Sequence, residues 1–306
     1  MYAVVTGAAG FIGSHLCADL LASGDDVLGI DAFTDHYDPA RKEDNLSGLL
    51  DRPNFRLLRR DLLSTPLREL FAGADVIYHL AGRPGVRARP RDFPRYLADN
   101  VNATHKLLQA AMEGGAGKVV YASSSSVYGD TRGSPATETM RPRPMSPYGV
   151  TKLAAEHLCE LYRTAHALPT VSLRLFTVYG LRQRPDMAFA RLTAAALHGG
   201  CFPLYGDGDQ TREFTHVSDV VTAMRAAAAS AFTGVANIGG GARASINEAI
   251  EIVERLTGPV DIRPFPACGD EARHTHADIS RAATAFGYRP SIALPEGLAA
   301  MMGHGR

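Results

Sequence analysis

The chain has 306 residues, of which 45% are hydrophobic and 21% are charged, proportions typical of a soluble protein with a sizeable core. Its 32 Lys and Arg residues balance its 32 Asp and Glu residues. The chain has neither a basic excess nor a long run of charge, so its sequence gives no indication of nucleic acid or a membrane surface as a partner.

The cysteines and the first residues predict the compartment. Cys17, Cys159, Cys201 and Cys268 lie far apart and form no CxxC pair, which disfavours zinc binding and a disulfide framework. The opening MYAVVTG reads as a strand rather than a signal peptide, and no apolar run is long enough to cross a bilayer. We expect a cytoplasmic protein with reduced thiols.

Short apolar runs alternate with helical patterns through the first half of the chain. Strand patterns occur at 2–7, 26–31, 55–61, 74–82, 118–124 and 170–180, and helical patterns at 11–24, 101–115 and 148–166. Strands that alternate with helices form a parallel sheet covered on both faces. We predict an α/β fold with a Rossmann-type doubly wound parallel sheet.

The second half of the chain has fewer strand patterns. Gly-rich turns occur in YGDGDQ and NIGGG, and an Ala-rich helix is expected at 223–231. We predict a smaller C-terminal lobe that is interleaved with the last elements of the sheet domain. The sheet domain would comprise 1–180 and about 212–240, and the smaller lobe 181–211 and 241–306.

Three glycines follow the first strand in TGAAGFIG. Gly7 allows a tight turn, Gly10 a close backbone approach to a pyrophosphate, and Gly13 close packing of helix on strand. Phosphate groups would then lie at the N-terminus of the first helix, where Phe11 and Ile12 are also assigned to the site. A plain strand-to-helix turn is the alternative.

Acidic residues end the second and third strands. Asp31 stands where a carboxylate can bind both ribose hydroxyls of an adenosine. No Lys or Arg follows Asp31 directly, so a 2′-phosphate would have no partner, and we predict NAD rather than NADP. Asp61 and Leu62 are placed for the adenine, although Asp61 can equally be a solvated strand end.

The sequence SPYGVTK carries Tyr148 and Lys152 at i and i+4 near the start of a predicted helix, so the two share one face. A nearby ammonium and a cationic nicotinamide would lower the pKa of the Tyr148 phenol, which is ordinarily about 10. Tyr148 could then take a proton from a sugar hydroxyl, while Lys152 also holds the nicotinamide ribose. A pair of solvated surface residues is the alternative.

Together these motifs resemble the extended short-chain dehydrogenases/reductases of the nucleotide-sugar epimerase and dehydratase group. The resemblance covers nearly the whole chain and includes TGAAGFIGSHL, YHLAG, YASSSSVYG, YGVTK, LRLFTVYG, YGDGDQTREFTHVSDV and NIGGG. It implies that Ser124 is a catalytic residue that hydrogen-bonds the sugar 4-hydroxyl. It also implies a cofactor site that includes Leu80, Ala81, Gly82 and Asn100.

The two residues after Ser124 bear on the reaction class. Dehydratases and decarboxylases of this group commonly have acids there, whereas this chain has Ser125 and Ser126. The resemblance therefore implies a 4-epimerase, which only removes and returns a hydride. The alternative for both serines is that they cap the turn after the strand.

The segment FTVYGLRQRPDMAFAR, together with AGRPGVR, resembles UDP-glucuronic acid 4-epimerases. Thr177 stands where UDP-glucose epimerases tend to have Asn. Ser125, Ser126 and Thr177 would donate hydrogen bonds to the substrate carboxylate. Arg184 would add charge near it or lie at the rim, and Arg87 and Met187 are further substrate contacts implied by the resemblance.

The diphosphate of a UDP-sugar needs cations. Arg212 in TREFTHV matches the phosphate-binding arginine of the group, and Arg191 is a second candidate or a solvated helix residue. Leu204 and Tyr205 would lie near the uracil. The second phosphate arginine usual in relatives is absent, and Arg273 is a candidate replacement. His274 and His276 lack metal-ligand spacing, and we expect no metal.

Three alternatives stay open at this point. The chain could epimerise UDP-glucose or UDP-N-acetylglucosamine, or it could decarboxylate UDP-glucuronate. It could also be a NAD-binding regulatory protein, although such proteins typically lose the Tyr or the Lys of the pair. The resemblance implies a homodimer through helices at 95–113 and 148–166, while a buried monomer face is the other interpretation of these helices.

Overall fold

A parallel sheet forms the centre of the computed structural model, which describes residues 1–85, 90–131, 134–267 and 272–303. The strands are β1 (Tyr2–Thr6), β2 (Asp26–Asp31), β3 (Phe55–Arg59), β4 (Val76–His79), β5 (Val119–Ser124), β6 (Thr170–Leu175) and β11 (Gly234–Ile238). Their order is β11-β6-β5-β4-β1-β2-β3, and every neighbouring pair is parallel. Strand order reverses at β1, and open α/β sheets bind ligands at such a switch point.

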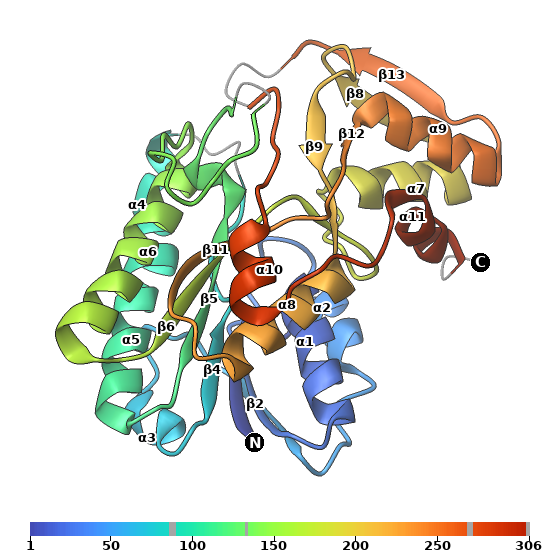
Figure 1. Cartoon of the computed structure of the whole chain (residues 1–306). Coiled ribbons are helices and arrows are strands. Elements are labelled where there is room, and N and C mark those ends of the chain that lie inside the picture. The colour runs from blue at the N-terminus through green and yellow to red at the C-terminus, as the bar shows by residue number, and fades with distance from the viewer. Residues whose placement is uncertain (86–89, 132–133, 268–271, 304–306) are drawn as a thin grey trace.

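Helices cover both faces of this sheet (Figure 1). One face carries α1 (Phe11–Ala22), α2 (Pro39–Leu46), α8 (Val217–Ala229) and α10 (Ser280–Phe286), and the other α3 (Arg68–Phe71), α4 (Phe93–Tyr96), α5 (Ala103–Gly114) and α6 (Pro147–His166). Successive side chains of β1 point to opposite faces of the sheet. Ala3 and Val5 therefore join one hydrophobic cluster and Val4 joins the other. The predicted fold class is confirmed.

A smaller lobe stands beyond one end of the sheet (Figure 1). It contains α7 (Ala188–His198), β8 (Cys201–Tyr205), β9 (Thr211–Glu213), β12 (Arg243–Ser245), α9 (Ile246–Thr257), β13 (Asp261–Phe265) and α11 (Leu294–Gly303). β13 pairs with β8, β12 pairs with β9, and the helices bury a third hydrophobic cluster. The lobe boundaries given above remain a prediction.

Two expected elements differ in detail from the structure. The strand expected over 170–180 is two strands, β6 and β7 (Val178–Tyr179), and β7 pairs with β10 (Thr215–His216) instead of the sheet. The helix expected over 101–115 is α5 preceded by a π-helical turn, η2 (Leu97–Asn102). Two short 3-10 turns, η1 (Pro90–Asp92) and η3 (Ser125–Val127), complete the set of described elements. The Ala-rich helix expected over 223–231 is the second half of α8, which ends at Ala229.

Candidate functional site

A cavity of about 960 Å³ lies between the sheet and the smaller lobe. Residues just after the carboxyl ends of β1, β2, β3, β4, β5 and β6 line it, together with residues of α7, β8 and β9. With two exceptions, every residue predicted for the cofactor or substrate lines this one cavity. Asn100 is outside the lining, and Arg87 lies outside the described residues.

The glycine-rich turn between β1 and α1 forms one wall. Gly7 has φ +71°, and a Cβ atom on it would meet the Ala81 nitrogen at 2.8 Å. A Cβ on Gly13 would lie 2.1 Å from the Gly7 oxygen, so neither position accepts a side chain. Gly10 is the N-cap of α1 and offers no side-chain cap, which leaves N–H groups of the first turn for an anion.

Asp31 stands at the end of β2 and is buried. Its carboxylate accepts hydrogen bonds from the backbone N–H groups of Ala9 (3.1 Å) and Phe33 (2.8 Å). Lys42 of α2 forms a buried ion pair with it, with Nζ 3.0 Å from Oδ1. The sequence analysis overlooked Lys42, because it considered only basic residues directly after Asp31.

Asp61 and Leu62 follow β3 and line the cavity near Asp31. The Asp61 carboxylate accepts the Leu63 N–H at 2.7 Å, and its carbonyl accepts the Thr65 hydroxyl at 2.6 Å. These bonds fix the turn after β3. Asp61 is therefore hydrogen-bonded within this turn and is not simply a solvated residue at the strand end.

The predicted catalytic pair lies at the start of α6. Ser146 caps the helix by accepting the Gly149 N–H at 3.1 Å, and Pro147 occupies the first turn, so Tyr148 and Lys152 face the cavity one turn apart. Lys152 Nζ donates to the Ala122 carbonyl at 2.8 Å. Burial lowers the pKa of Lys152 to about 8, while the thiol of Cys159 and the carboxylate of Glu156 raise it.

Tyr148 is affected by its surroundings in a way that the sequence did not predict. Burial is the largest effect and raises the pKa of its phenol, while a hydrogen bond with Ser124 and the charge of Arg184 lower it. Lys152 Nζ lies 5.9 Å from the centre of the Tyr148 ring, and the lowering of this pKa by the ammonium together with a bound nicotinamide stays a prediction. Ser124 and Arg184 are the side chains that favour the phenolate.

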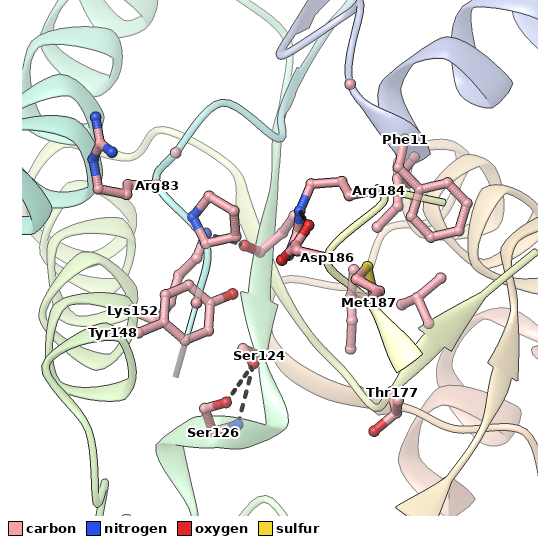
Figure 2. Close-up of a pocket in the computed structure, with 18 of the residues that line it drawn as sticks. Phe11, Arg83, Ser124, Ser126, Tyr148, Lys152, Thr177, Arg184, Asp186 and Met187 are labelled. Atoms are coloured by element: carbon pink, nitrogen blue, oxygen red, sulfur yellow. Dashed lines mark hydrogen bonds and ion pairs between the residues drawn. The ribbon is translucent and has the colours of Figure 1, made fainter. Parts of the chain in front are cut away.

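The serine run ends β5 and enters η3. The Ser124 hydroxyl oxygen accepts the Ser126 N–H at 3.1 Å and donates to the Ser126 hydroxyl at 3.1 Å, the two dashed contacts of Figure 2. Ser124 is thus the residue that caps the turn, a role that the sequence analysis considered for its two neighbours. Ser125 and Ser126 line the cavity.

The connection from β6 to α7 forms the opposite wall and carries Thr177, Arg184 and Met187 (Figure 2). The guanidinium of Arg184 binds Asp186 through two contacts, Nε–Oδ1 and Nη2–Oδ2, each 3.0 Å. Asp186 lines the same cavity and was not predicted. Only its spacing of two residues from Arg184 could have indicated the pair.

The smaller lobe contributes Arg191, Leu204, Tyr205 and Arg212. Nη1 of Arg212 donates to the carbonyls of Thr211 (3.0 Å) and Arg273 (3.1 Å). Arg273 also lines the cavity, and its side chain pairs with Asp207 at 2.8 Å. Within the described ranges, no group of three or more His, Cys, Asp and Glu residues is arranged to hold a metal ion.

Asn100 lies behind the cavity wall, in the π-helical turn η2. Its side-chain oxygen accepts the Arg83 N–H at 2.7 Å, and its amide nitrogen donates to the Arg83 carbonyl and the Thr151 hydroxyl. Asn100 therefore fixes the loop after β4 to α6. Its predicted contact with the cofactor stays a prediction, and its side-chain oxygen would lie 2.8 Å from a Cβ atom on the cavity residue Gly82.

Comparison with known proteins identifies the family. The model of the NAD dependent epimerase/dehydratase family matches residues 3–239, more than half of the chain. The chain belongs to this family. The match confirms the predicted family and NAD as its cofactor.

Relatives of this epimerase/dehydratase family cover nearly the whole chain. A structure of UDP-glucuronic acid 4-epimerase from Bacillus cereus, in complex with UDP-glucuronic acid and NAD, has a TM-score of 0.96 and 41% identity, over 100% of this chain and 99% of that one. UDP-glucuronate 4-epimerase of Thermodesulfobacterium geofontis is 35% identical over 97% of this chain and 94% of its own. An uncharacterised UDP-glucose epimerase of Bacillus subtilis is 42% identical over 97% and 96%.

The site fits the cofactor of the family. The turn of Gly7 and Gly13 is a cradle that any Cβ would fill, and the uncapped start of α1 suits a pyrophosphate. Asp31 lies at the strand end that meets an adenosine ribose. No helix within the described residues is long and apolar enough to cross a membrane.

Proposed function

We propose that the protein is a NAD-dependent 4-epimerase that interconverts UDP-glucuronate and UDP-galacturonate through a 4-keto intermediate. The observation that carries the proposal is the composition of the cavity wall: Ser124 and Tyr148 face it together with the hydroxyls of Ser125, Ser126 and Thr177. Both residues that follow Ser124 are neutral, where a dehydratase would need an acid. Relatives named for the same reaction support this assignment.

The proposed chemistry needs a base at the sugar 4-hydroxyl. NAD, when bound in this cavity, would supply reversible hydride transfer at C4 of the sugar. Tyr148 takes the hydroxyl proton, and Ser124, which hydrogen-bonds Tyr148, positions the same hydroxyl. Lys152 holds the nicotinamide ribose and supplies positive charge beside the phenol. The division of the chain into a cofactor domain and a substrate lobe is part of this proposal.

The 4-keto intermediate is a β-keto acid, which loses carbon dioxide readily. We propose that Ser125, Ser126 and Thr177 hold the carboxylate so that the breaking bond stays out of line with the carbonyl π system. Arg184 supplies charge nearby, while Met187 contacts the sugar. The double variant Thr177→Ala with Ser125→Ala should form pentose sugar. Unchanged product purity would refute this role.

The UDP portion would extend toward the smaller lobe. Arg191 and Arg212 are proposed to bind the diphosphate, because both are cations in the cavity lining, and Leu204 and Tyr205 to lie against the uracil. Arg273 is a weaker candidate for the diphosphate, since its guanidinium already pairs with Asp207. We also propose a cytoplasmic location, which the free thiols of Cys17, Cys159 and Cys201 support.

A homodimer is the proposed assembly. Large apolar side chains are exposed on the outer face of α6 and on the turns around η2: Val150 43%, Leu161 50%, Phe93 37% and Leu97 40%. Val150 and Leu161 lie in the expected range 148–166 and Leu97 in the range 95–113, while Phe93 lies just before the latter. Exposed apolar surface concentrated on two adjacent helices is typical of a protein contact.

The first experiment follows UDP-glucuronate by NMR with purified protein and NAD. A stable mixture with UDP-galacturonate and no carbon dioxide is the expected result. A UDP-pentose or 4-keto-pentose product would instead mean decarboxylation. No reaction with UDP-glucuronate, together with turnover of UDP-glucose or UDP-N-acetylglucosamine, would establish the runner-up, which the relative from Bacillus subtilis supports.

A further inference from the structure

Beneath the serine run lies an ion pair that the proposed chemistry does not use. Arg174 of β6 and Glu156 of α6 bind through Nε–Oε1 (3.0 Å) and Nη2–Oε2 (2.7 Å), and their side chains are 5% and 4% exposed. Pairs this buried add little stability over apolar residues of similar size, because desolvation offsets the Coulomb attraction. A gain in stability therefore does not account for this pair.

The pair holds the start of the serine run. The Ser123 hydroxyl donates to Oε1 of Glu156, and Ser123 is buried. One helical turn earlier, Lys152 donates to the Ala122 carbonyl. Two successive residues of β5 are therefore bound by successive turns of the helix that carries Tyr148, and Ser124 is the next residue along the strand.

The same pair holds the end of the run. Nη1 of Arg174 donates to the Tyr128 hydroxyl at 2.8 Å, and that hydroxyl donates to Oδ1 of Asn237 at 2.7 Å. Tyr128 and Asn237 are buried, and the guanidinium lies 4.7 Å from the centre of the Tyr128 ring. The ion pair thus binds both ends of the segment that contains Ser124, Ser125 and Ser126, through Glu156 at Ser123 and through Arg174 at Tyr128.

We propose that Arg174 and Glu156 are positioning residues that clamp the segment 123–128 and so set the hydroxyls of Ser124, Ser125 and Ser126 relative to Tyr148. The inference rests on the proposed function for the role of these hydroxyls. An arginine suits the task because its planar fork binds Glu156 and Tyr128 at once, whereas a lysine offers a single ammonium. Neither residue touches the cavity, since neither is in its lining.

The test removes one contact at each end without leaving a buried charge unpaired. Tyr128→Phe deletes the contact at the end of the run and Ser123→Ala the contact at its start. Tyr78→Phe is the matched control, because Tyr78 is a buried tyrosine of β4 whose hydroxyl has no hydrogen-bond partner within the described part of the chain. All three keep the charges of the pair.

Misplaced hydroxyls should slow the chemical step more than they weaken substrate binding. We expect kcat to fall about tenfold in Tyr128→Phe and in Ser123→Ala, with KM for UDP-glucuronate little changed. We also expect carbon dioxide release. In that side reaction the bond from C5 to the carboxyl carbon breaks, a proton from water joins C5, and the hydride taken from C4 is not returned, so reduced nicotinamide accumulates and its absorbance rises.

If the contacts are purely structural, the variants should have a lower thermal unfolding midpoint but unchanged kcat, carbon dioxide release and nicotinamide absorbance. Variants that fold but match Tyr78→Phe in kcat and product purity would overturn the clamp. If Tyr128→Phe does not fold, Ser123→Ala decides the question alone. Failure of the wild-type protein to act on UDP-glucuronate would count against the proposed function only, and the kcat comparison would then use the UDP-sugar that is turned over.

Discussion

At the scale of single residues, Asp31, the predicted ribose ligand, is also part of a buried ion pair. Its carboxylate has about four lone-pair sites, and the N–H groups of Ala9, Phe33 and Lys42 occupy three of them. One site is left open on the carboxylate, and its predicted bonds to both ribose hydroxyls stay a prediction. Lys42 keeps further N–H donors beside this carboxylate, so we predict that the two residues share recognition of the cofactor.

The variant Asp31→Ala should change cofactor preference. Loss of one charged hydrogen bond should raise the NAD dissociation constant about tenfold. Lys42 would then lack its buried partner and should favour a 2′-phosphate, so the NADP dissociation constant should fall. Calorimetric titration of each cofactor measures both, with Glu43→Gln on the exposed face of α2 as the control. An unchanged ratio of the two constants would show that Asp31 does not discriminate.

Local spacing predicted Asp31 but not Lys42, and the reason is physical. A carboxylate directly after a strand is placed by the strand itself, so its position at the sheet edge follows from the sequence pattern. Lys42 reaches Asp31 only because α2 packs against the glycine-rich turn, where Asn45 donates to the Ala9 carbonyl at 3.0 Å. Contacts that depend on how a helix packs leave no local signature in the chain.

At the scale of elements, α6 has one face toward the cavity and the sheet and one apolar face exposed on the outside. Tyr148, Lys152 and Glu156 recur every four residues and point inward, while Val150 and Leu161 are exposed on its outer side. The inward spacing was visible in the sequence. The break between β6 and β7 was not, because its cause is remote in the chain: Phe176 donates to the Ile238 carbonyl and Thr215 donates to the Thr177 carbonyl.

The exposed face of α6 gives a test of assembly. Leu161→Arg should convert a dimer into a monomer, since a charge at the centre of an apolar contact loses its water. Leu256→Arg is the matched control, because Leu256 is 41% exposed on α9 in the smaller lobe. Light scattering after size-exclusion chromatography measures the mass. A monomeric wild type, or equal masses for the two variants, would exclude this face as the dimer contact.

At the scale of the whole molecule, the cavity exists because the chain leaves the sheet after β6 and returns to it only at β11. The intervening segment supplies Thr177, Arg184 and Arg191 on one side of the space and Arg212 on another. The family resemblance pointed to each of these residues individually. Their convergence on one cavity depends on how the smaller lobe packs, through the cluster of Tyr179, Phe189 and Phe214, and no motif encodes that packing.

His79 connects three elements of the sheet domain and is fully buried. Thr6 Oγ1 lies 2.8 Å from its Nδ1, and Thr104 Oγ1 lies 2.9 Å from its Nε2. The Thr104 hydroxyl donates to the Asn100 carbonyl, so it accepts from Nε2–H, and Thr6 is left to donate to Nδ1. This arrangement holds a neutral ring between β1, β4 and α5.

Burial accordingly lowers the pKa of His79 from 6.5 to about 3, with a smaller lowering from Lys152. Between these two values the unfolded chain binds a proton that the folded protein does not, so stability rises with pH across the window and is lost as pH falls through it. At about pH 5 the loss is on the order of 2 kcal/mol relative to neutral pH. His15, whose pKa burial lowers to about 4, adds to the same slope.

Urea denaturation at pH values from neutral to about pH 5 measures this slope in the wild type and in His79→Gln. The variant should be less stable at neutral pH, because it loses a hydrogen-bonded ring. Its free energy of unfolding should also depend less steeply on pH, because about one proton fewer is taken up on unfolding. A wild type whose free energy of unfolding stays flat over this range would contradict the neutral ring. A variant that keeps the wild-type slope of unfolding free energy against pH would also contradict it, since another group would then bind the proton.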